Sequence, residues 1–392
     1  MKTTSYVERT AAPAVRRAPR GRRALRLLGR AGLALLALAV VYLAATPDGR
    51  WLVRAGYEEG RILARRHPIA ELVAAGSGVD ARTRAKLQLV LAARAFAADS
   101  LGLDAGRSFT QYTDIGRDTL VLVLSGARRD TLAGTTWWFP VVGRVPYKGF
   151  WDRASGQAAA AALRADSLDA WLRPAGAFST LGWFDDPLLN TTLAADTVDL
   201  TNTVIHELTH NTYYAPGQAA FNESFASFVG ARGAERFFAG RGDTGRAAEA
   251  ARRWADDQLL GAFWARLTQA VDSAYAAHPG DGPGVRARRV AARAAVTQWA
   301  RGLLADSVAP LLSGARGRPV EPARRRRWAD RVVLDNAALL ARRTYARELP
   351  LFDQVLAREG GDVRRAVTRI VALAKSRKDD PYGAVRGWVG RP

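Results

Sequence analysis

The 392-residue chain contains no cysteine. Disulfide bonds and cysteine nucleophiles are therefore excluded, and cysteine cannot serve as a metal ligand. Attachment to a membrane through a lipid-modified cysteine is excluded for the same reason. The missing cysteine does not by itself identify a cellular compartment.

Histidine is scarce, since the chain has only four. Two of them, His206 and His210, flank Glu207 in the pattern His-Glu-Leu-Thr-His. Residues four apart share one face of a helix, so both imidazoles can bind one metal ion while Glu207 reaches a water molecule on that metal. His67 and His278 show no ligand spacing, and we interpret both as ordinary loop or surface residues.

A third metal ligand is expected downstream of the histidine pair. A catalytic zinc ion typically keeps three protein ligands and one position open to water. Glu223, in the segment Asn-Glu-Ser-Phe-Ala, is the carboxylate that fits best. The sequence therefore predicts a Zn²⁺ site made by His206, His210 and Glu223, with Glu207 as the catalytic base. The alternatives are a surface helix whose charges are only solvated, and a metal site without activity.

Two helices joined by a short turn are predicted to carry this site. The first covers 196–213, with Asp196 as a possible N-cap, and Pro216-Gly217 ends it. The second begins near Ala219. Its glutamate heads a narrow face of small residues that would let the two helices approach closely, made by Ala226, Ser227 and Gly230. The opposite side is expected to anchor the helix in a core through Phe225, Phe228 and Val229.

Acidic residues are few compared with basic ones. The chain has 37 Asp and Glu against 58 Lys and Arg, which gives a net charge of +21. The basic residues are almost all arginine and are spread through alanine-rich segments, and no nucleic-acid-binding motif accompanies them. A nucleic-acid partner is therefore not expected.

One uncharged apolar stretch follows a basic segment near the N-terminus. Residues 1–30 carry nine basic side chains and one acidic one. This order predicts a basic cytoplasmic N-terminus over 1–30 and a transmembrane anchor over 31–47. Everything after the anchor would then lie outside the cytoplasmic membrane, in the periplasm. A cleaved signal peptide is the alternative interpretation.

The rest of the chain predicts an α+β fold that is predominantly helical. A small mixed sheet is expected before the metal helix, from strand-like segments at 119–124, 135–143 and 175–183. Helices are expected at 80–101 and 152–165, and nearly everything after residue 219 reads as helix. The predicted domains are a catalytic region over 55–240 and a helical C-terminal region over 241–392.

Several segments occur in a characteristic order along the chain. They are 139–143, 147–150, 179–189, the His-Glu-x-x-His motif and 221–229. In combination they resemble a bacterial family of predicted zinc aminopeptidases, and 221–226 is similar to the segment that carries the third zinc ligand in gluzincin aminopeptidases. The resemblance spans 55–240, and Asn336, Ala337 and Tyr345 extend it to about residue 355. It implies a zinc metallopeptidase with the ligands and base named above.

Substrate-binding residues are predicted from the same region. Metallopeptidases commonly place a sheet edge that pairs with extended peptide some twenty residues before the metal helix, and 177–184 occupies that position. The predicted substrate contacts are Ser179, Thr180, Asp186 and Tyr147, with Asp185 or Asp186 as the candidate for holding a free α-amine. An internal strand and a simple Asp-Asp-Pro turn are the alternatives. Candidates for stabilising the oxyanion are Tyr147, Tyr213, Tyr214 and Tyr345.

The sequence thus predicts an enzyme that hydrolyses peptide bonds with zinc, and an aminopeptidase in particular. A zinc endopeptidase is the alternative within the same chemistry. A membrane-anchored scaffold that binds zinc and hydrolyses nothing is the alternative outside it. The preferred substrate residue and the oligomeric state are not predicted.

Overall fold

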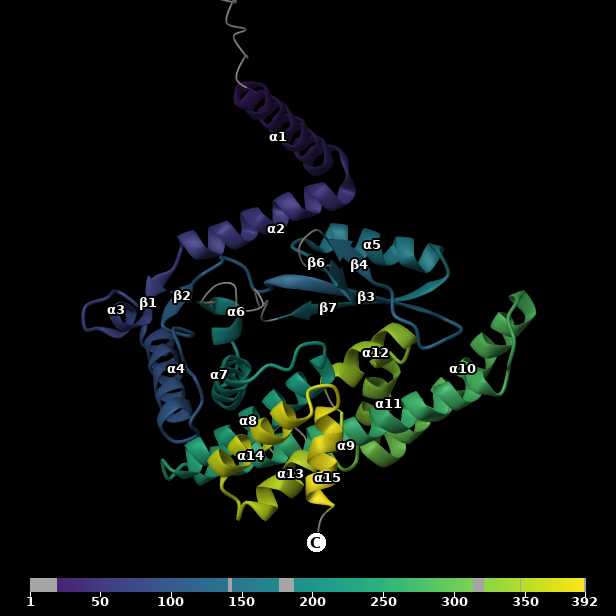
Figure 1. The fold of residues 1–392 in the computed structure, drawn as a ribbon. Helices are drawn as coiled ribbons and strands as arrows, with labels where there is room; N and C mark the ends of the chain where they lie inside the picture. The colour runs from purple at the N-terminus through teal and green to yellow at the C-terminus, as the bar shows by residue number, and fades with distance from the viewer. Residues whose placement is uncertain (1–19, 140–142, 176–186, 313–320, 346, 391–392) are drawn as a thin grey trace, which may run out of the picture. The chain divides into compact units, whose positions relative to one another are not determined.

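A computed structural model describes residues 20–139, 143–175, 187–312, 321–345 and 347–390 (Figure 1). The chain divides into two compact units, one up to Arg61 and one from Ile62 onward. Helix α1 (Arg20–Ala45) lies in the first unit, and helix α2 (Pro47–Ala64) crosses the boundary between the two.

Helix α1 carries the predicted membrane segment. Its part Leu27–Ala45 is long enough and apolar enough to cross a membrane, and none of that part is buried within the protein. The candidate span begins four residues before the predicted start at residue 31 and includes Arg30. By length and composition, α1 is either a single membrane span or a signal sequence.

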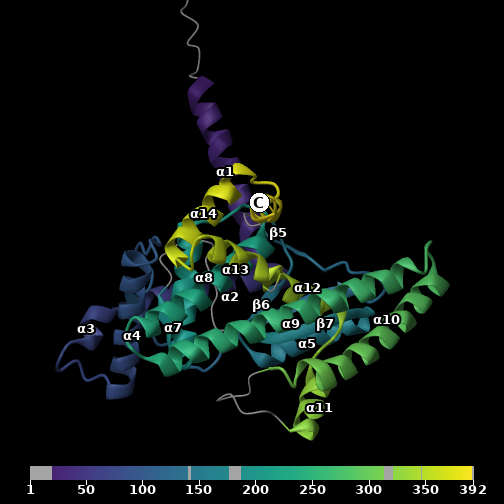
Figure 2. The ribbon, with the colours of Figure 1, turned by 90° about the horizontal axis from the view of Figure 1, so that it is seen from below.

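Helices make up most of the second unit. They are α3 (Ile69–Val73), α4 (Ala81–Asp99), α5 (Arg153–Ala165), α6 (Asn190–Leu193), α7 (Thr197–Thr212), α8 (Ala219–Ala239), α9 (Thr244–Ala276), α10 (Pro283–Leu303), α11 (Pro322–Arg331), α12 (Asn336–Tyr345), α13 (Leu349–Arg358), α14 (Val363–Ser376) and α15 (Pro381–Val389), with a short π-helix η1 (Leu304–Val308). Helices α9 and α10 run side by side as a long pair (Figure 2). The predicted helices at 80–101 and 152–165 are confirmed as α4 and α5.

The main sheet has the strand order β6-β3-β7, and both pairs of neighbours are antiparallel. Its strands are β3 (Val121–Arg128), β6 (Lys148–Phe150) and β7 (Leu168–Ala175). Successive side chains point to opposite faces of a sheet. Leu124, Ala170 and Leu172 pack with α5 on one face. The other face turns toward the side where α7, α8 and α12 lie (Figure 1).

The remaining strands are very short. A second sheet has the order β1-β2-β8, made by β1 (His67–Pro68), β2 (Gln111–Thr113) and β8 (Leu188–Leu189). A hairpin pairs β4 (Trp137–Phe139) with β5 (Gly143–Val145). The single strand predicted over 135–143 is therefore wrong, because the chain reverses within it and Gly143 adopts a φ of +73°.

Strand β7 was not predicted in its true place. The sequence pattern puts a strand over 175–183, whereas β7 ends at Ala175 and 176–186 lie outside the described residues. The interior of β7 holds the polar and proline residues Arg173 and Pro174, so no clean alternation marks it as a strand.

The main hydrophobic core surrounds α7 and α8. It combines residues from Ile69 to Trp254 with residues from Leu349 to Val385. Aromatic rings pack at its centre, with ring centroids 5.3–6.2 Å apart, and belong to Phe221, Phe225, Phe228, Trp254, Phe352 and Tyr382. The fold is α+β and predominantly helical, as predicted, while the domain boundary at residue 240 stays a prediction.

Candidate metal centre

Helix α7 carries the histidine pair and forms as its sequence predicts. The Asp196 carboxylate caps it, accepting hydrogen bonds from the backbone N–H groups of Val198 and Asp199 at 2.9 and 3.0 Å. Such a cap satisfies amide groups that have no partner within the helix. The helix spans Thr197–Thr212, within one residue of the expected limits at each end.

The small residues of α8 bring this helix very close to α7. A Cβ atom added at Gly230 would lie 2.2 Å from Oδ1 and 2.9 Å from the carbonyl oxygen of Asn202, and 3.2 Å from Cβ of His206. Gly233 is also tightly packed, since its added Cβ would lie 2.9 Å from Cγ2 of Ile205. The predicted close approach is therefore confirmed, and on the other side of α8 the side chains of Phe225, Phe228 and Val229 are buried as expected.

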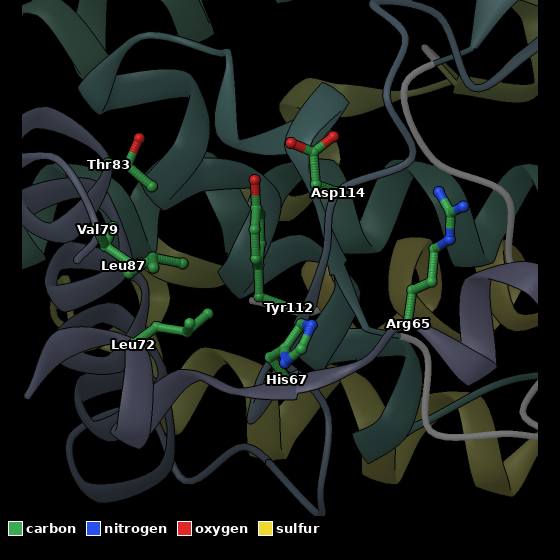
Figure 3. A pocket seen from close by; sticks show the side chains of 8 residues that line it. All are labelled: Arg65, His67, Leu72, Val79, Thr83, Leu87, Tyr112 and Asp114. Carbon is green, nitrogen blue, oxygen red and sulfur yellow. The ribbon is translucent and has the colours of Figure 1, made fainter. Parts of the chain in front are cut away.

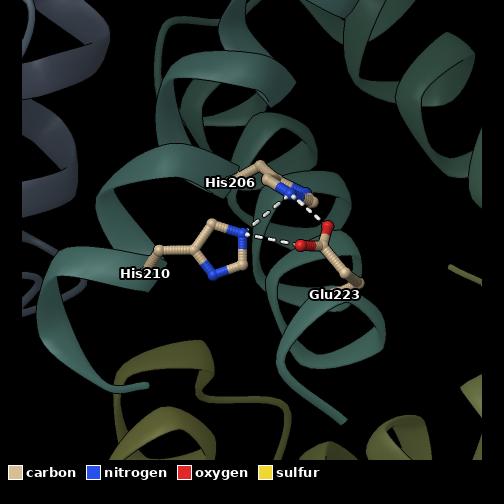
Figure 4. Close-up of side chains that lie close together, drawn as sticks. All are labelled: His206, His210 and Glu223. Atoms are coloured by element: carbon tan, nitrogen blue, oxygen red, sulfur yellow. Dashed lines mark hydrogen bonds and ion pairs between the residues drawn. The ribbon is translucent and has the colours of Figure 1, made fainter. Parts of the chain in front are cut away.

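Three side chains converge between the two helices (Figure 4). His206 Nε2 lies 3.2 Å from His210 Nε2 and 3.4 Å from Glu223 Oε2. His210 Nε2 lies 3.7 Å from Glu223 Oε1. All three side chains are about one-fifth exposed, so a small ion could reach them from solvent.

These separations fit the geometry of a zinc site. Zinc binds imidazole nitrogen and carboxylate oxygen at about 2.0–2.2 Å, and two ligands at that distance from a tetrahedral centre lie about 3.3–3.5 Å apart. The three separations of 3.2, 3.4 and 3.7 Å bracket that value. No other group of three or more such side chains in the described part of the chain is arranged to hold a metal ion. The residues present therefore fit zinc without rearrangement.

The charged groups of the site act strongly on one another. Burial by itself lowers the pKa of His206, but its hydrogen bond with Glu223 and the charges of Glu207 and Glu223 outweigh burial and raise that pKa. Burial and then the positive charge of His206 lower the pKa of His210 to about 4. Burial favours the neutral form of Glu223, yet the two histidines lower its pKa on balance. A neutral imidazole beside a charged carboxylate is the protonation state that a metal ion requires.

The turn between α7 and α8 fixes the position of Glu223. The buried Asn222 side chain accepts a hydrogen bond from the Ala215 N–H at 2.9 Å and donates one to the Ala215 carbonyl at 2.8 Å. The Asn222 amide thus closes the turn that precedes Glu223. His210 Nδ1 is buried and has no hydrogen-bond partner among the described residues.

The predicted base stands beside the ligands. Glu207 follows His206 on α7, is half-buried, and its negative charge contributes to the raised pKa of His206. Its charge therefore acts on the imidazole of a proposed ligand.

The predicted tyrosines separate into two groups. The Tyr214 ring lies 6.4 Å from the His210 ring and is half-exposed. Burial and then the charge of Glu223 raise the pKa of Tyr147, which puts its hydroxyl within electrostatic reach of the site. Tyr213 instead packs against the core, with Lys375 Nζ 6.0 Å from its ring centre, so it points away. Tyr345 is the last residue of α12.

The other predicted substrate residues, Ser179, Thr180 and Asp186, lie outside the described residues. A separate pocket of about 360 Å³ contains none of the predicted substrate residues (Figure 3). It is lined by Arg65, His67, Leu72, Val79, Thr83, Leu87, Tyr112 and Asp114. None of the residues predicted for catalysis lines it.

Comparison with known proteins identifies the family of the chain. No curated protein and no solved structure matches it. Residues 50–381 match the sequence profile of a family described as "Putative aminopeptidase". This match covers more of the chain than the resemblance seen in the sequence and includes both helices of the candidate metal centre. The chain therefore belongs to this aminopeptidase family, which implies a hydrolase that acts on peptides.

Proposed function

We propose that the chain is a zinc-dependent aminopeptidase whose catalytic residues are carried by α7 and α8. The observation that supports this most directly is the convergence of His206, His210 and Glu223, with nitrogen and oxygen atoms 3.2–3.7 Å apart. A three-ligand site leaves one zinc position for water, which is the arrangement of catalytic rather than structural zinc sites.

Glu207 is the proposed general base. Zinc, when bound, supplies a Lewis acid that polarises a carbonyl oxygen and lowers the pKa of a bound water toward about 7. Glu207 would accept the proton of the attacking water and then pass it to the nitrogen of the leaving amine. His206, His210 and Glu223 would hold the ion, and the close packing of the two helices would keep them in place.

Tyr214 and Tyr147 are the proposed donors to the oxyanion that forms at the scissile carbonyl. A phenolic hydroxyl group can donate a hydrogen bond to such an oxyanion. The proposal is supported by the Tyr214 ring, whose centre lies 6.4 Å from that of the His210 ring, and by the pKa of Tyr147, which burial and then the charge of Glu223 raise. Tyr213 is not proposed, because its ring belongs to the core.

We also propose that the catalytic part lies outside the cytoplasmic membrane. The support is the apolar segment Leu27–Ala45 of α1 and the excess of basic residues that precedes it. Positive residues are retained on the cytoplasmic side of a membrane span.

A single substitution with a matched control tests the proposed mechanism. Glu207→Gln in the full chain should lower kcat on a peptide with a free N-terminus by about 10²–10⁴-fold, because a general base typically contributes that factor. Its zinc content should match that of the wild type, since Glu207 is not a ligand. Glu235→Gln on α8, which alters a carboxylate paired with Arg232, should leave both quantities unchanged. Full activity in Glu207→Gln would contradict the proposal.

A further inference from the structure

Helix α8 begins without a side-chain cap of its own. Gln218 precedes the helix, and its side chain makes no capping hydrogen bond within the described part of the chain. Helix ends are the parts of a helix that open most easily, because the amide groups there have no partner inside the helix. Glu223 is the fifth residue of α8, so the third proposed ligand lies close to such an end. Helix α7, which carries the two histidines, differs because Asp196 caps it.

The C-terminal part of the chain forms hydrogen bonds with this end of α8. The Tyr382 hydroxyl of α15 lies 3.0 Å from the carbonyl oxygen of Ala220 and can donate to it. The Gln218 side chain donates to the carbonyl oxygen of Asp379, just before α15, at 3.0 Å. Residues more than 150 positions later in the chain thus hold the end of the helix that carries Glu223.

Ser224 completes this attachment. The Arg347 N–H donates to Oγ of Ser224 at 3.1 Å, and the Tyr382 hydroxyl also lies 3.0 Å from the Arg347 carbonyl oxygen. Burial raises the pKa of Tyr382, and a hydrogen bond with the Ser224 side chain opposes that rise. One network therefore joins Ser224 of α8, Arg347 before α13 and Tyr382 of α15. We call this network, together with the contacts of Ala220 and Asp379, the C-terminal clamp.

The Tyr382 side chain is itself firmly held. It is 4% exposed, and its ring centre lies 5.3 Å from that of Phe221 and 6.1 Å from that of Phe352. Aromatic rings at such distances pack favourably when they meet edge to face or tilted. Arg386 of α15 also pairs with Glu348 at 2.7 Å, next to the start of α13. The hydroxyl of Tyr382 is therefore a fixed point to which α8 is attached.

The two residues of α8 bound by Tyr382 enclose the third proposed ligand. In an α-helix the carbonyl of one residue accepts from the N–H four residues later, so Ala220 and Ser224 close the turn that contains Glu223. The carboxylate oxygens of Glu223 lie 3.4 and 3.7 Å from the histidine nitrogens. Zinc ligands must lie within about 0.2 Å of their preferred distances from the metal. A shift of this turn would therefore move Glu223 out of reach of an ion held by the histidines.

We propose that Tyr382 and Ser224 are positioning residues, which hold this turn of α8 where Glu223 can bind zinc together with the two histidines. This inference rests on the proposed zinc site and deepens it. Residues that support metal ligands from outside commonly affect metal affinity although they do not touch the metal. Because such coupling is reciprocal, zinc bound to Glu223 should in turn strengthen the attachment of α15 to α8.

Tyr382→Phe tests the clamp, because it keeps the ring and removes the hydroxyl. Zinc affinity, measured on the full chain in detergent by competition with a chelating dye, should fall by about 3–10-fold, the factor that one hydrogen bond typically contributes. Tyr275→Phe is the matched control. It removes a comparably buried hydroxyl that donates to the Arg129 carbonyl at 2.9 Å, but in a different hydrophobic cluster.

The control separates positioning from general stability. Tyr275→Phe should lower the thermal stability of the fold and leave the zinc affinity unchanged, whereas Tyr382→Phe should lower both. An unchanged zinc affinity in Tyr382→Phe would overturn the proposal. An equal loss of zinc affinity in Tyr275→Phe would also overturn it, because the effect would then be one of stability alone.

Ser224→Ala tests the other half of the network. It should weaken zinc binding by a similar factor. The double variant Ser224→Ala with Tyr382→Phe should lose less than the product of the two single effects, because both changes remove one shared network. Unchanged zinc affinity in Ser224→Ala, or effects that simply multiply, would overturn the joint role of the two residues.

The unsubstituted chain offers a measurement that does not depend on the folding of any variant. Hydrogen exchange followed by mass spectrometry should show slower exchange of the α15 amides when zinc is bound, together with those of α7 and α8. Amides of α10, which packs in the other cluster, should exchange at the same rate with and without zinc. Zinc that slows exchange in α7 and α8 but not in α15 would overturn the coupling.

Failure of the clamp and failure of the proposed function give different results. If the wild-type chain binds zinc and cuts peptides while Tyr382→Phe and Ser224→Ala bind zinc as tightly, the function stands and the clamp is wrong. If the wild-type chain binds no zinc and hydrolyses no peptide, the proposed function itself is wrong.

Discussion

Gly230→Ala is the substitution for which the structure gives the most definite expectation. The added Cβ would lie 2.9 Å from the backbone oxygen of Asn202 and 3.2 Å from Cβ of His206. An ordinary contact needs about 3.5 Å, so α7 and α8 would have to separate by about 0.5 Å. The Asn202 side chain, 2.2 Å away, can rotate, but its backbone cannot. The cost therefore falls on the packing of the two helices that carry the proposed ligands.

Two opposing effects determine how much Gly230→Ala changes the stability of the fold. Alanine is more favourable than glycine inside a helix by about 1 kcal/mol, whereas overpacking a close contact costs about 1–3 kcal/mol. The Gly302→Ala control, in α10, adds a Cβ that meets nothing within 4 Å and should show only the favourable effect. We expect Gly230→Ala to be about 1–3 kcal/mol less stable than Gly302→Ala. Displacing a ligand helix should also weaken zinc binding by about 10–100-fold, as changes around metal ligands typically do.

Thermal unfolding by circular dichroism and zinc competition with a chelating dye, both on the full chain in detergent, measure these two effects. Wild type, Gly230→Ala and Gly302→Ala should be compared under the same conditions. If Gly230→Ala matched Gly302→Ala in both stability and zinc affinity, the close approach of α7 and α8 would not be what holds the proposed site together.

Three further predictions concern the turn, the pocket and the substrate. Asn222→Ala should destabilise the chain by about 1–3 kcal/mol and lower its zinc affinity, because two buried hydrogen bonds to Ala215 are lost. Thermal unfolding measures the stability and dye competition the zinc affinity. Unchanged values of both would refute the role of the turn. Burial raises the pKa of Tyr112 to about 12, so between about pH 10 and 12 the folded state keeps a proton that the unfolded chain loses, and the stability of the fold should fall as the pH rises through this range. Tyr112→Phe should remove this part of the pH dependence. An identical stability profile in Tyr112→Phe and wild type would contradict this prediction. Peptides acetylated at the N-terminus should be spared while their free counterparts are cut, as followed by mass spectrometry, and equal cleavage would indicate an endopeptidase.

The helices of the site could be predicted from the sequence because their signals are local. The cap at Asp196, the break at Pro216 and the small residues after Glu223 lie in one continuous stretch of the chain, 196–230. Each acts through its immediate neighbours, so the pattern along the chain contains most of what determines the structure. The convergence of the three side chains was expected for the same reason.

The direction of the tyrosines could not be predicted in this way. Tyr213 ends α7 in an extended conformation, with φ −156° and ψ 130°. Neighbouring side chains in extended backbone point to opposite sides, so Tyr213 turns into the core and Tyr214 toward His210. The pattern of residues shows that a helix ends here, but not which of two adjacent rings faces the site.

The strands β1, β2 and β8 were not predicted, because strands of two or three residues are too short to show alternation.

Zinc content tests the central claim most directly. The full wild-type chain, equilibrated with zinc and freed of excess, should hold one zinc ion per molecule by elemental analysis. Glu223→Ala should lose most of that zinc, because one of three ligands is removed, whereas Glu235→Gln on the same helix should keep it. A wild-type chain that holds no zinc, or a Glu223→Ala chain that binds it as tightly as the wild type, would contradict the proposed metal centre.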